Sequence, residues 1–223
     1  MAAEKVTSEE QVSRQQKESW EGWFEFIVAA ILGLATLGSA WSAYQSSLWG
    51  GIQDFRIAEA HISGREAGEK IIFANQLRGI DVVLFERYVS AISENNKQLA
   101  DFLFQRFRPE FRPAIDAWLA TKPLKNATAP PSPFAMKEYK LAAEKAAEQL
   151  RQQEEKRFAE AREANQISDT YLLVTVLYSI VLFLGGITAA FERRTVSLGV
   201  LGLSVITLIA ASIAMLFLPL AAE

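Results

Sequence analysis

The sequence contains no cysteine and one histidine, His61, in 223 residues. Without cysteine, the protein has neither a disulfide framework nor a thiolate metal site. Glutamate and arginine residues surround His61, and a lone histidine in such a stretch is expected to be solvated or packed against a helix. A glycine-rich phosphate loop, a nucleophile elbow and an H-E-x-x-H pattern are absent from the sequence as well. We therefore expect no cofactor, no metal site and no enzymatic activity.

Charge is missing from three long blocks of the sequence: residues 26–53, 170–191 and 195–222. Each block exceeds the roughly 20 apolar residues that a helix needs to cross a hydrocarbon core. After a polar tail at residues 1–22, we predict transmembrane helices at residues 23–50, 170–191 and 195–220. The alternative is a signal peptide cleaved after Ala40, which the long and acidic segment before the first apolar run disfavours. The spans also lack the internal charges that mark proton relays and substrate paths in transporters.

The segment between the first two spans, residues 51–169, contains 18 Lys and Arg and 18 Asp and Glu. This balance argues against the basic face that nucleic-acid binding requires. Two helix-forming stretches flank a proline-rich tip at residues 108–135. The first stretch carries an apolar stripe at helical spacing: Phe73, Leu77, Ile80, Leu84, Tyr88 and Ile92. We predict a long antiparallel, coiled-coil-like helical hairpin that begins after a break or kink at Gly50-Gly51 and ends at Asp169. Trp118 and Phe134 are expected to be exposed at its tip and to meet a protein partner.

Aromatic and amide side chains mark the end of the first span: Trp41, Tyr44, Gln45 and Trp49, followed by Gly51. Indole and phenol rings favour the headgroup level of a bilayer, so this segment predicts the point where the helix leaves the membrane. Three roles remain open for Gln45. It is an interfacial anchor, a specific contact to another helix or subunit, or a residue that lines a pore or a ligand site.

Small residues recur every four positions in the first span: Ala35, Ser39, Ala43 and Ser47. Small side chains let a second helix approach closely, which is how membrane helices pack. The stripe predicts a contact face for another helix, or self-association of the protein. The alternative is that alanine and serine are simply common in such helices.

Arg193 and Arg194 lie in the short turn between the second and third spans. Short loops rich in arginine stay in the cytoplasm, so this turn predicts a cytoplasmic N-terminus and an extracytoplasmic segment 51–169. The expected location is the inner membrane of a cell, with the lipid bilayer as a partner.

Two segments occur together in this chain, W-x-x-Y-Q-x-x-x-W-x-G at residues 41–51 and A-W-L-A through A-P-P-S-P-F at residues 117–134. Together they resemble a family of uncharacterised bacterial integral membrane proteins, over nearly the full length. The resemblance implies a bacterial inner-membrane protein and implies no activity.

The predicted fold is an all-α integral membrane protein with three transmembrane helices and a helical hairpin between spans 1 and 2. The predicted function is non-enzymatic: presentation of the extracytoplasmic helical domain for protein interaction or assembly. The alternative is a homo-oligomeric channel or a transport-associated subunit, which would gate by dewetting of an apolar bore. An enzyme is the least favoured alternative because no catalytic constellation was found.

Overall fold

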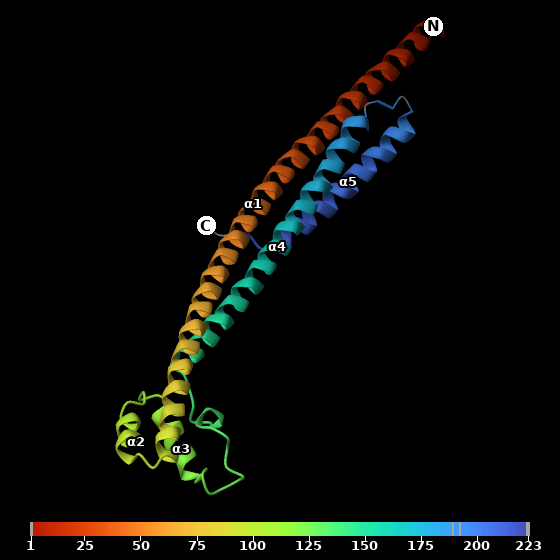
Figure 1. Cartoon of the computed structure of the whole chain (residues 1–223). Helices are drawn as coiled ribbons and strands as arrows, with labels where there is room; N and C mark the ends of the chain where they lie inside the picture. Colours follow the sequence, from red (N-terminus) through yellow and green to blue (C-terminus); the bar gives the residue numbers. More distant parts are fainter. Residues whose placement is uncertain (1, 189, 192, 222–223) are drawn as a thin grey trace. The chain divides into compact units, whose positions relative to one another are not determined.

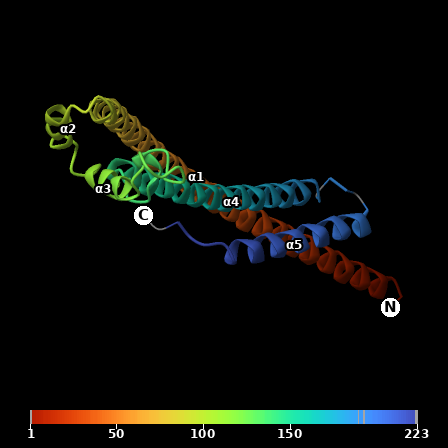
Figure 2. The same cartoon turned by 60° about the horizontal axis from the view of Figure 1, so that its bottom comes forward.

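The computed structural model describes residues 2–188, 190–191 and 193–221, and side chains from Gly22 onward within these ranges. All regular secondary structure in these ranges is helical (Figures 1 and 2). The elements are α1 Ala2–Ser93, α2 Lys97–Phe104, α3 Arg112–Ala120, the 3₁₀ helix η1 Pro133–Ala135, α4 Ala142–Thr188 and α5 Arg194–Leu216. The all-α prediction is confirmed. Three helices, α1, α4 and α5, are long and apolar enough to cross a membrane.

Both α1 and α4 are longer than the sequence predicts. α1 passes through Gly50 and Gly51 without a break, and α4 passes through Asp169. The expectation of a helix break at the glycine pair is therefore wrong, and the arm that the sequence predicts to end at Asp169 continues in the same helix into the apolar part of α4. Two glycines cost a helix only about 1 kcal/mol each relative to alanine, and the good helix formers on either side offset this cost. The tail predicted at residues 1–22 belongs to α1 from Ala2 on, and its side chains before Gly22 lie outside the described residues.

The chain divides into two compact units. Unit 1 comprises residues 1–55 and 160–223, and unit 2 comprises residues 56–159. Both α1 and α4 contribute residues to each unit.

Unit 1 is built from α1, α4 and α5 around a narrow apolar core. Its buried members are Ile31, Ala35, Val174, Tyr178, Val181, Leu201 and Ala211. Buried positions follow each other at spacings of three, four and seven along all three helices, which keeps one stripe of each helix inside. The helices approach closely at Gly38, where the ring of Tyr178 occupies the space that a Cβ atom would take. Glycine is required there by this contact.

Unit 2 changes from an alanine seam to an aromatic core along α1. Ala60, Ala67 and Ala74 are buried seven residues apart, the spacing at which side chains return to the same face of a helix. Arg78 of α1 forms an ion pair with Glu144 near the start of α4, at 3.1 Å.

The aromatic core of unit 2 collects side chains from α1, α2, α3 and the turns between them: Tyr88, Ala91, Ala100, Leu103, Phe107, Phe111, Ala114 and Ile115. α1 ends because Asn95 adopts a left-handed conformation, with φ of 57°. The Asn96 side chain then accepts a hydrogen bond from the Leu99 N–H at 3.1 Å and starts α2. Pro113 lies in the first turn of α3, where its missing N–H costs no hydrogen bond. These short elements fold the proline-rich segment into a defined structure.

Candidate functional site

The glutamine and second tryptophan of the predicted motif bind the chain segment that follows α5. Gln45 Oε1 accepts a hydrogen bond from the Ala221 N–H at 3.0 Å. Trp49 Nε1 donates to the Pro219 carbonyl at 3.1 Å, and Tyr171 OH, from α4, donates to the same carbonyl at 3.2 Å. The segment after α5 is thereby held by side chains of both other helices of unit 1. Gln45 is 2% exposed, so its amide oxygen is committed to this contact.

The other members of the motif face outward. Trp41 is 44% exposed and Tyr44 is 47% exposed, and their ring centroids lie 5.9 Å apart. No atom lies within 4 Å of a Cβ built on Gly51, so packing does not require glycine there. The motif therefore combines an intramolecular contact with an outward pair of aromatic rings.

At the residue that follows Gln45, α1 and α4 exchange hydrogen bonds through two serines. Ser46 Oγ donates to the Ser168 carbonyl at 3.0 Å, and Ser168 Oγ donates to the Ser46 carbonyl at 2.9 Å. These reciprocal bonds fix the two helices in register next to the motif. Sequence reasoning missed this pair because Ser46 and Ser168 are 122 residues apart and neither belongs to a pattern.

The predicted stripe of small residues consists of Ala35, Ser39, Ala43 and Ser47. Only Ala35 is buried, whereas Ala43 and Ser47 are exposed. The packing face of α1 continues instead through Gly38, which contacts the ring of Tyr178, and through the buried Ser42 and Gln45. A spacing of four drifts around a helix of 3.6 residues per turn, while alternating steps of three and four stay on one face. Within this chain the stripe beyond Ala35 is thus not the packing face.

Arg193 and Arg194 are exposed at the start of α5, in the connection from α4. Arg193 is the N-cap residue of α5. Ser197 Oγ donates to the Thr188 carbonyl at 3.1 Å and fastens the first turn of α5 to the end of α4. The structure therefore places Arg193 directly before α5 and Arg194 at its first position.

Comparisons with known proteins give no information on the role of these residues. No protein-family model, curated protein or solved structure matches this chain. The resemblance suggested by the two sequence segments stays a prediction.

The structure corrects the expectation that Trp118 and Phe134 are exposed at a tip. Trp118 is 6% exposed, and its Nε1 donates to the Pro130 carbonyl at 2.8 Å. Phe134 is half-buried and stacks on Phe111, with ring centroids 5.1 Å apart. The proline-rich segment folds back over α3, so both rings pack inside unit 2. Trp118 is therefore buried, and only part of the Phe134 ring is exposed.

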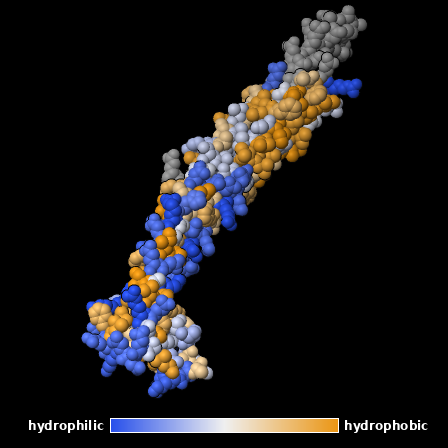
Figure 3. Space-filling view, viewed as in Figure 1, coloured by the Kyte–Doolittle hydropathy of each residue, from blue (hydrophilic) through white to orange (hydrophobic). Residues whose placement is uncertain are grey.

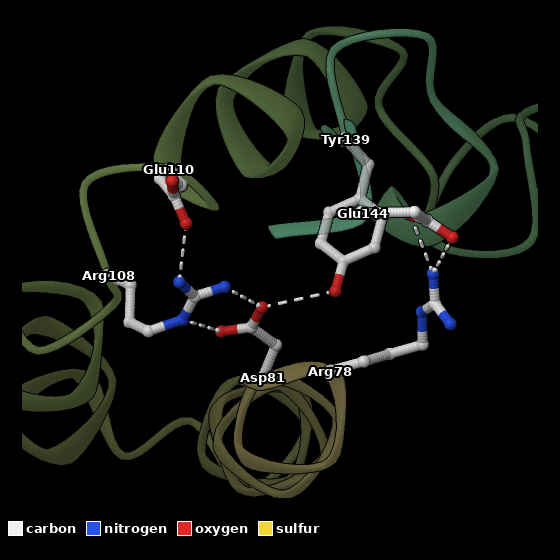
Figure 4. A network of polar contacts seen from close by, with 6 residues as sticks. All are labelled: Arg78, Asp81, Arg108, Glu110, Tyr139 and Glu144. Atoms are coloured by element: carbon white, nitrogen blue, oxygen red, sulfur yellow. Dashed lines mark hydrogen bonds and ion pairs between the residues drawn. The ribbon is translucent and has the colours of Figure 1, made fainter. Parts of the chain in front are cut away.

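A buried carboxylate organises the polar contacts of unit 2 (Figure 4). Asp81 of α1 is fully buried. Its two oxygens accept hydrogen bonds from Arg108 Nε at 3.0 Å and Arg108 Nη2 at 2.7 Å, a two-pronged ion pair. Tyr139 OH donates to Asp81 Oδ2 at 3.2 Å, and Arg108 Nη1 reaches Glu110 at 2.8 Å. The network joins α1, the turn after α2 and the segment before α4.

Two groups of this network, Arg108 and Tyr139, have raised pKa values. The hydrogen bonds that Arg108 donates to Asp81 raise the pKa of Arg108 above its ordinary value, so the guanidinium stays charged. Burial, and after it the charge of Asp81, raises the pKa of Tyr139 to about 12. Asp81 accepts three hydrogen bonds and is inaccessible to solvent, so the geometry favours a structural role over acid–base chemistry. The sequence signal for Asp81 was its place in the seam, seven residues after Ala74.

Metal ligands do not gather among the residues that the structure describes: no group of three or more His, Asp and Glu side chains could hold an ion there. His61 packs edge-on against Phe158 of α4, with ring centroids 5.6 Å apart.

An apolar face of α1 in unit 2 has no cover in the single chain. We call it the outer face, and it consists of Ile72, Phe73, Ile80 and Val83, which are 60%, 51%, 50% and 51% exposed. These residues fall within about 100° of the helix circumference. Phe73 and Ile80 belong to the stripe that the sequence predicts as packed, whereas Tyr88, further along, is buried. The first half of that stripe therefore lacks the packing partner that its pattern predicts.

Proposed function

We propose that this is a non-enzymatic membrane protein whose unit 1 lies in the bilayer and whose unit 2 offers the outer face of α1 to a protein partner. The observation that carries the proposal is the exposure of this apolar face outside the charge-free blocks. The exposed Gln76 lies between the four side chains of this face on the helix surface. Several large apolar side chains exposed on one face of a folded unit mark an interaction site, since they are otherwise an aggregation liability. A helix face of this kind suits a second helix with an apolar stripe, including that of a second copy of the chain.

The apolar exterior of unit 1 supports the membrane anchor. Leu37 of α1, Phe183 of α4 and Ile206 of α5 are 71%, 65% and 66% exposed. On the face that Figure 3 shows, apolar side chains form a broad band over this part of the molecule. α5 has 23 residues, which corresponds to about 35 Å at the rise of an α-helix. A hydrocarbon core of about 30 Å fits this length.

Two tryptophans of α1, the exposed Trp23 and the half-buried Trp49, support the same placement. Trp23 is 58% exposed, and Trp49 binds Pro219 at the other end of the apolar stretch. The 26 steps between them span about 39 Å. This distance matches a bilayer measured between its two interfacial regions, where indole rings are favoured.

Charge supports the orientation of the proposed anchor. The short connection with Arg193 and Arg194 carries two positive charges and would lie in the cytoplasm of a bacterial cell. The N-terminus would then share that side, and unit 2 would lie outside, built on an antiparallel hairpin of α1 and α4. Ion pairs between the two helices, Arg78–Glu144 and Arg157–Glu59, support the hairpin.

Self-association and a channel form the second candidate. Ala43 and Ser47 are exposed on α1, so a neighbouring copy could pack there closely. This candidate requires a closed ring of copies. Native mass spectrometry of the protein released from detergent tests it: Ala43→Leu should abolish a ring by steric clash, and a single copy in the unaltered protein would exclude the channel.

The experiment for the proposed function places a photoreactive benzoylphenylalanine at Phe73 in the full-length protein in cells. Irradiation should give a discrete cross-linked product, because a partner covers the outer face. The matched control carries the same group at Gln152, an exposed position on α4. The product from position 73 should disappear when Ile80 is also replaced by glutamate. No product at position 73, or the same product from both positions, would contradict the proposal.

A further inference from the structure

A second feature of unit 2 has the properties of a small-molecule site. It is a half-open pocket of about 420 Å³ between the end of α1, the end of α3 and the loop that follows α3. The lining residues are Val89, Ile92, Trp118, Leu119, Lys122, Pro123, Leu124 and Lys125. The volume lies in the lower part of the range for ligand pockets, and an apolar lining with few polar groups is typical of them. One short apolar chain fits such a space better than the two chains of a membrane lipid.

The charge of the lining has one sign. Lys122 and Lys125 contribute two ammonium groups, and no carboxylate lines the pocket. Among the residues that the structure describes, neither lysine lies in an ion pair. Both side chains are exposed, so an anion at the mouth of the pocket can reach them.

The backbone at Lys122 is in an unfavourable conformation for lysine. Its φ is 52°, in the left-handed region, directly after the C-cap residue Thr121 of α3. Glycine is the residue that helices usually place there, because it has no Cβ to clash. Outliers of this kind cluster at ligand sites, where the side chain is needed for another purpose. Here the conformation brings a lysine to the pocket.

We propose that this pocket binds a small anionic amphiphile: a single acyl chain of medium length that ends in a carboxylate. The chain would lie on Ile92, Trp118 and Leu124, and the carboxylate would pair with Lys122 and Lys125. Apolar walls give affinity for the chain, and the two lysines select the sign of the head group. This inference is independent of the proposed protein partner, because the pocket and the outer face share no residue.

The test uses the full-length protein in nanodiscs of zwitterionic phosphatidylcholine, labelled with 5-fluorotryptophan. Of the five tryptophans, Trp118 is the one in unit 2, so its ¹⁹F resonance reports on the pocket. Trp118→Phe identifies that resonance. Titration with octanoate should shift it to saturation, while octanol and octyltrimethylammonium should bind at least about tenfold more weakly.

Variants separate the proposed site from non-specific partitioning. Replacing both Lys122 and Lys125 by glutamine should raise the dissociation constant of octanoate about tenfold, whereas Lys97→Gln, an exposed lysine on α2, should leave it unchanged. Lys122→Gly should also weaken octanoate binding, yet keep or raise the thermal midpoint, because it relieves the left-handed backbone.

Several results would overturn the proposal. They are no saturable shift with octanoate, equal affinity for the three amphiphiles, or unchanged affinity in the double lysine variant. A shift of the Trp118 resonance caused by phosphatidylglycerol in the nanodisc, without octanoate, would identify a membrane lipid as the occupant. A shift caused only by an acidic peptide would identify a protein segment, and each of these two results would refute the acyl carboxylate.

Discussion

Removal of the buried carboxylate by Asp81→Ala should destabilise unit 2 more than any change at an exposed ion pair. The substitution removes both acceptors of the Arg108 guanidinium and the acceptor of Tyr139 OH. Arg108 keeps its contact to Glu110 and has 20% of its side chain exposed. The guanidinium therefore stays charged, but it loses its buried partner.

The magnitude follows from burial. Leaving one charge of a buried pair without its partner costs about 3–5 kcal/mol, and the partial exposure of Arg108 places this case near 3 kcal/mol. Since 1.36 kcal/mol corresponds to a factor of ten, the population of open unit 2 should rise about 150-fold. The Arg78–Glu144 pair has side chains 39% and 51% exposed, so Glu144→Gln should cost less than about 1 kcal/mol.

The assay is amide hydrogen exchange measured by mass spectrometry on the full-length protein, with peptides from α2 and α3. Local opening limits this exchange, so Asp81→Ala should accelerate it by about two orders of magnitude. Glu144→Gln should change it less than about fivefold. In the double variant Asp81→Leu with Arg108→Met, exchange should return to within about tenfold of the unaltered protein, because no unpaired charge remains. Acceleration by Asp81→Ala of less than about fivefold would refute the structural role of the network.

Three further predictions concern single side chains. Burial raises the pKa of Tyr139 to about 12 from an ordinary value of 10.0, so its neutral form stabilises unit 2 fully below pH 10, and this stabilisation is lost as pH rises towards 12. Amide hydrogen exchange of unit 2, compared with that of Tyr139→Phe over this pH range, measures the loss. The same pH dependence in both proteins would contradict it. Gly38→Ala should destabilise unit 1 by about 1–3 kcal/mol through a clash with the facing tyrosine of α4, whereas Gly33→Ala, with open space around it, should be neutral in thermal unfolding in detergent. Gln45→Ala should remove a hydrogen bond to Ala221 worth about 0.6–2 kcal/mol, seen as increased mobility of a spin label at the C-terminal end, and unchanged mobility would argue against this contact.

Periodicity and hydropathy predicted the coarse architecture. The all-helical class and three helices of sufficient length and apolarity follow from charge-free blocks, because these are summed over many residues. Helix ends were harder: Gly50, Gly51 and Asp169 carry the usual signals of a break, yet α1 and α4 continue through them. Single residues have small propensity costs, and packing over tens of residues outweighs them.

Contacts between distant residues could not be read from sequence spacing. The motif at Trp49 was visible as a pattern, but its partner Pro219 is 170 residues away. Asp81 lies within a helical stripe, and its partner Arg108 belongs to a turn whose geometry depends on the surrounding aromatic core. Trp118 was predicted exposed because proline-rich loops are usually solvated, whereas here the Pro130 carbonyl satisfies its indole N–H and permits burial.

The central proposal is that the helices of unit 1 cross a membrane and leave unit 2 on its outer side. The absence of native cysteine allows a direct measurement, in which single cysteines replace Lys137 in unit 2 or Ser8 near the N-terminus. Lys137 has 91% of its side chain exposed, so a cysteine there is open to reagents. The reagent is a thiol label that passes the outer but not the inner membrane of intact bacterial cells. It should label the variant with cysteine at position 137, and it should label the variant with cysteine at position 8 only after the cells are lysed. Labelling of position 8 but not of position 137, or of both positions in intact cells, would contradict the account.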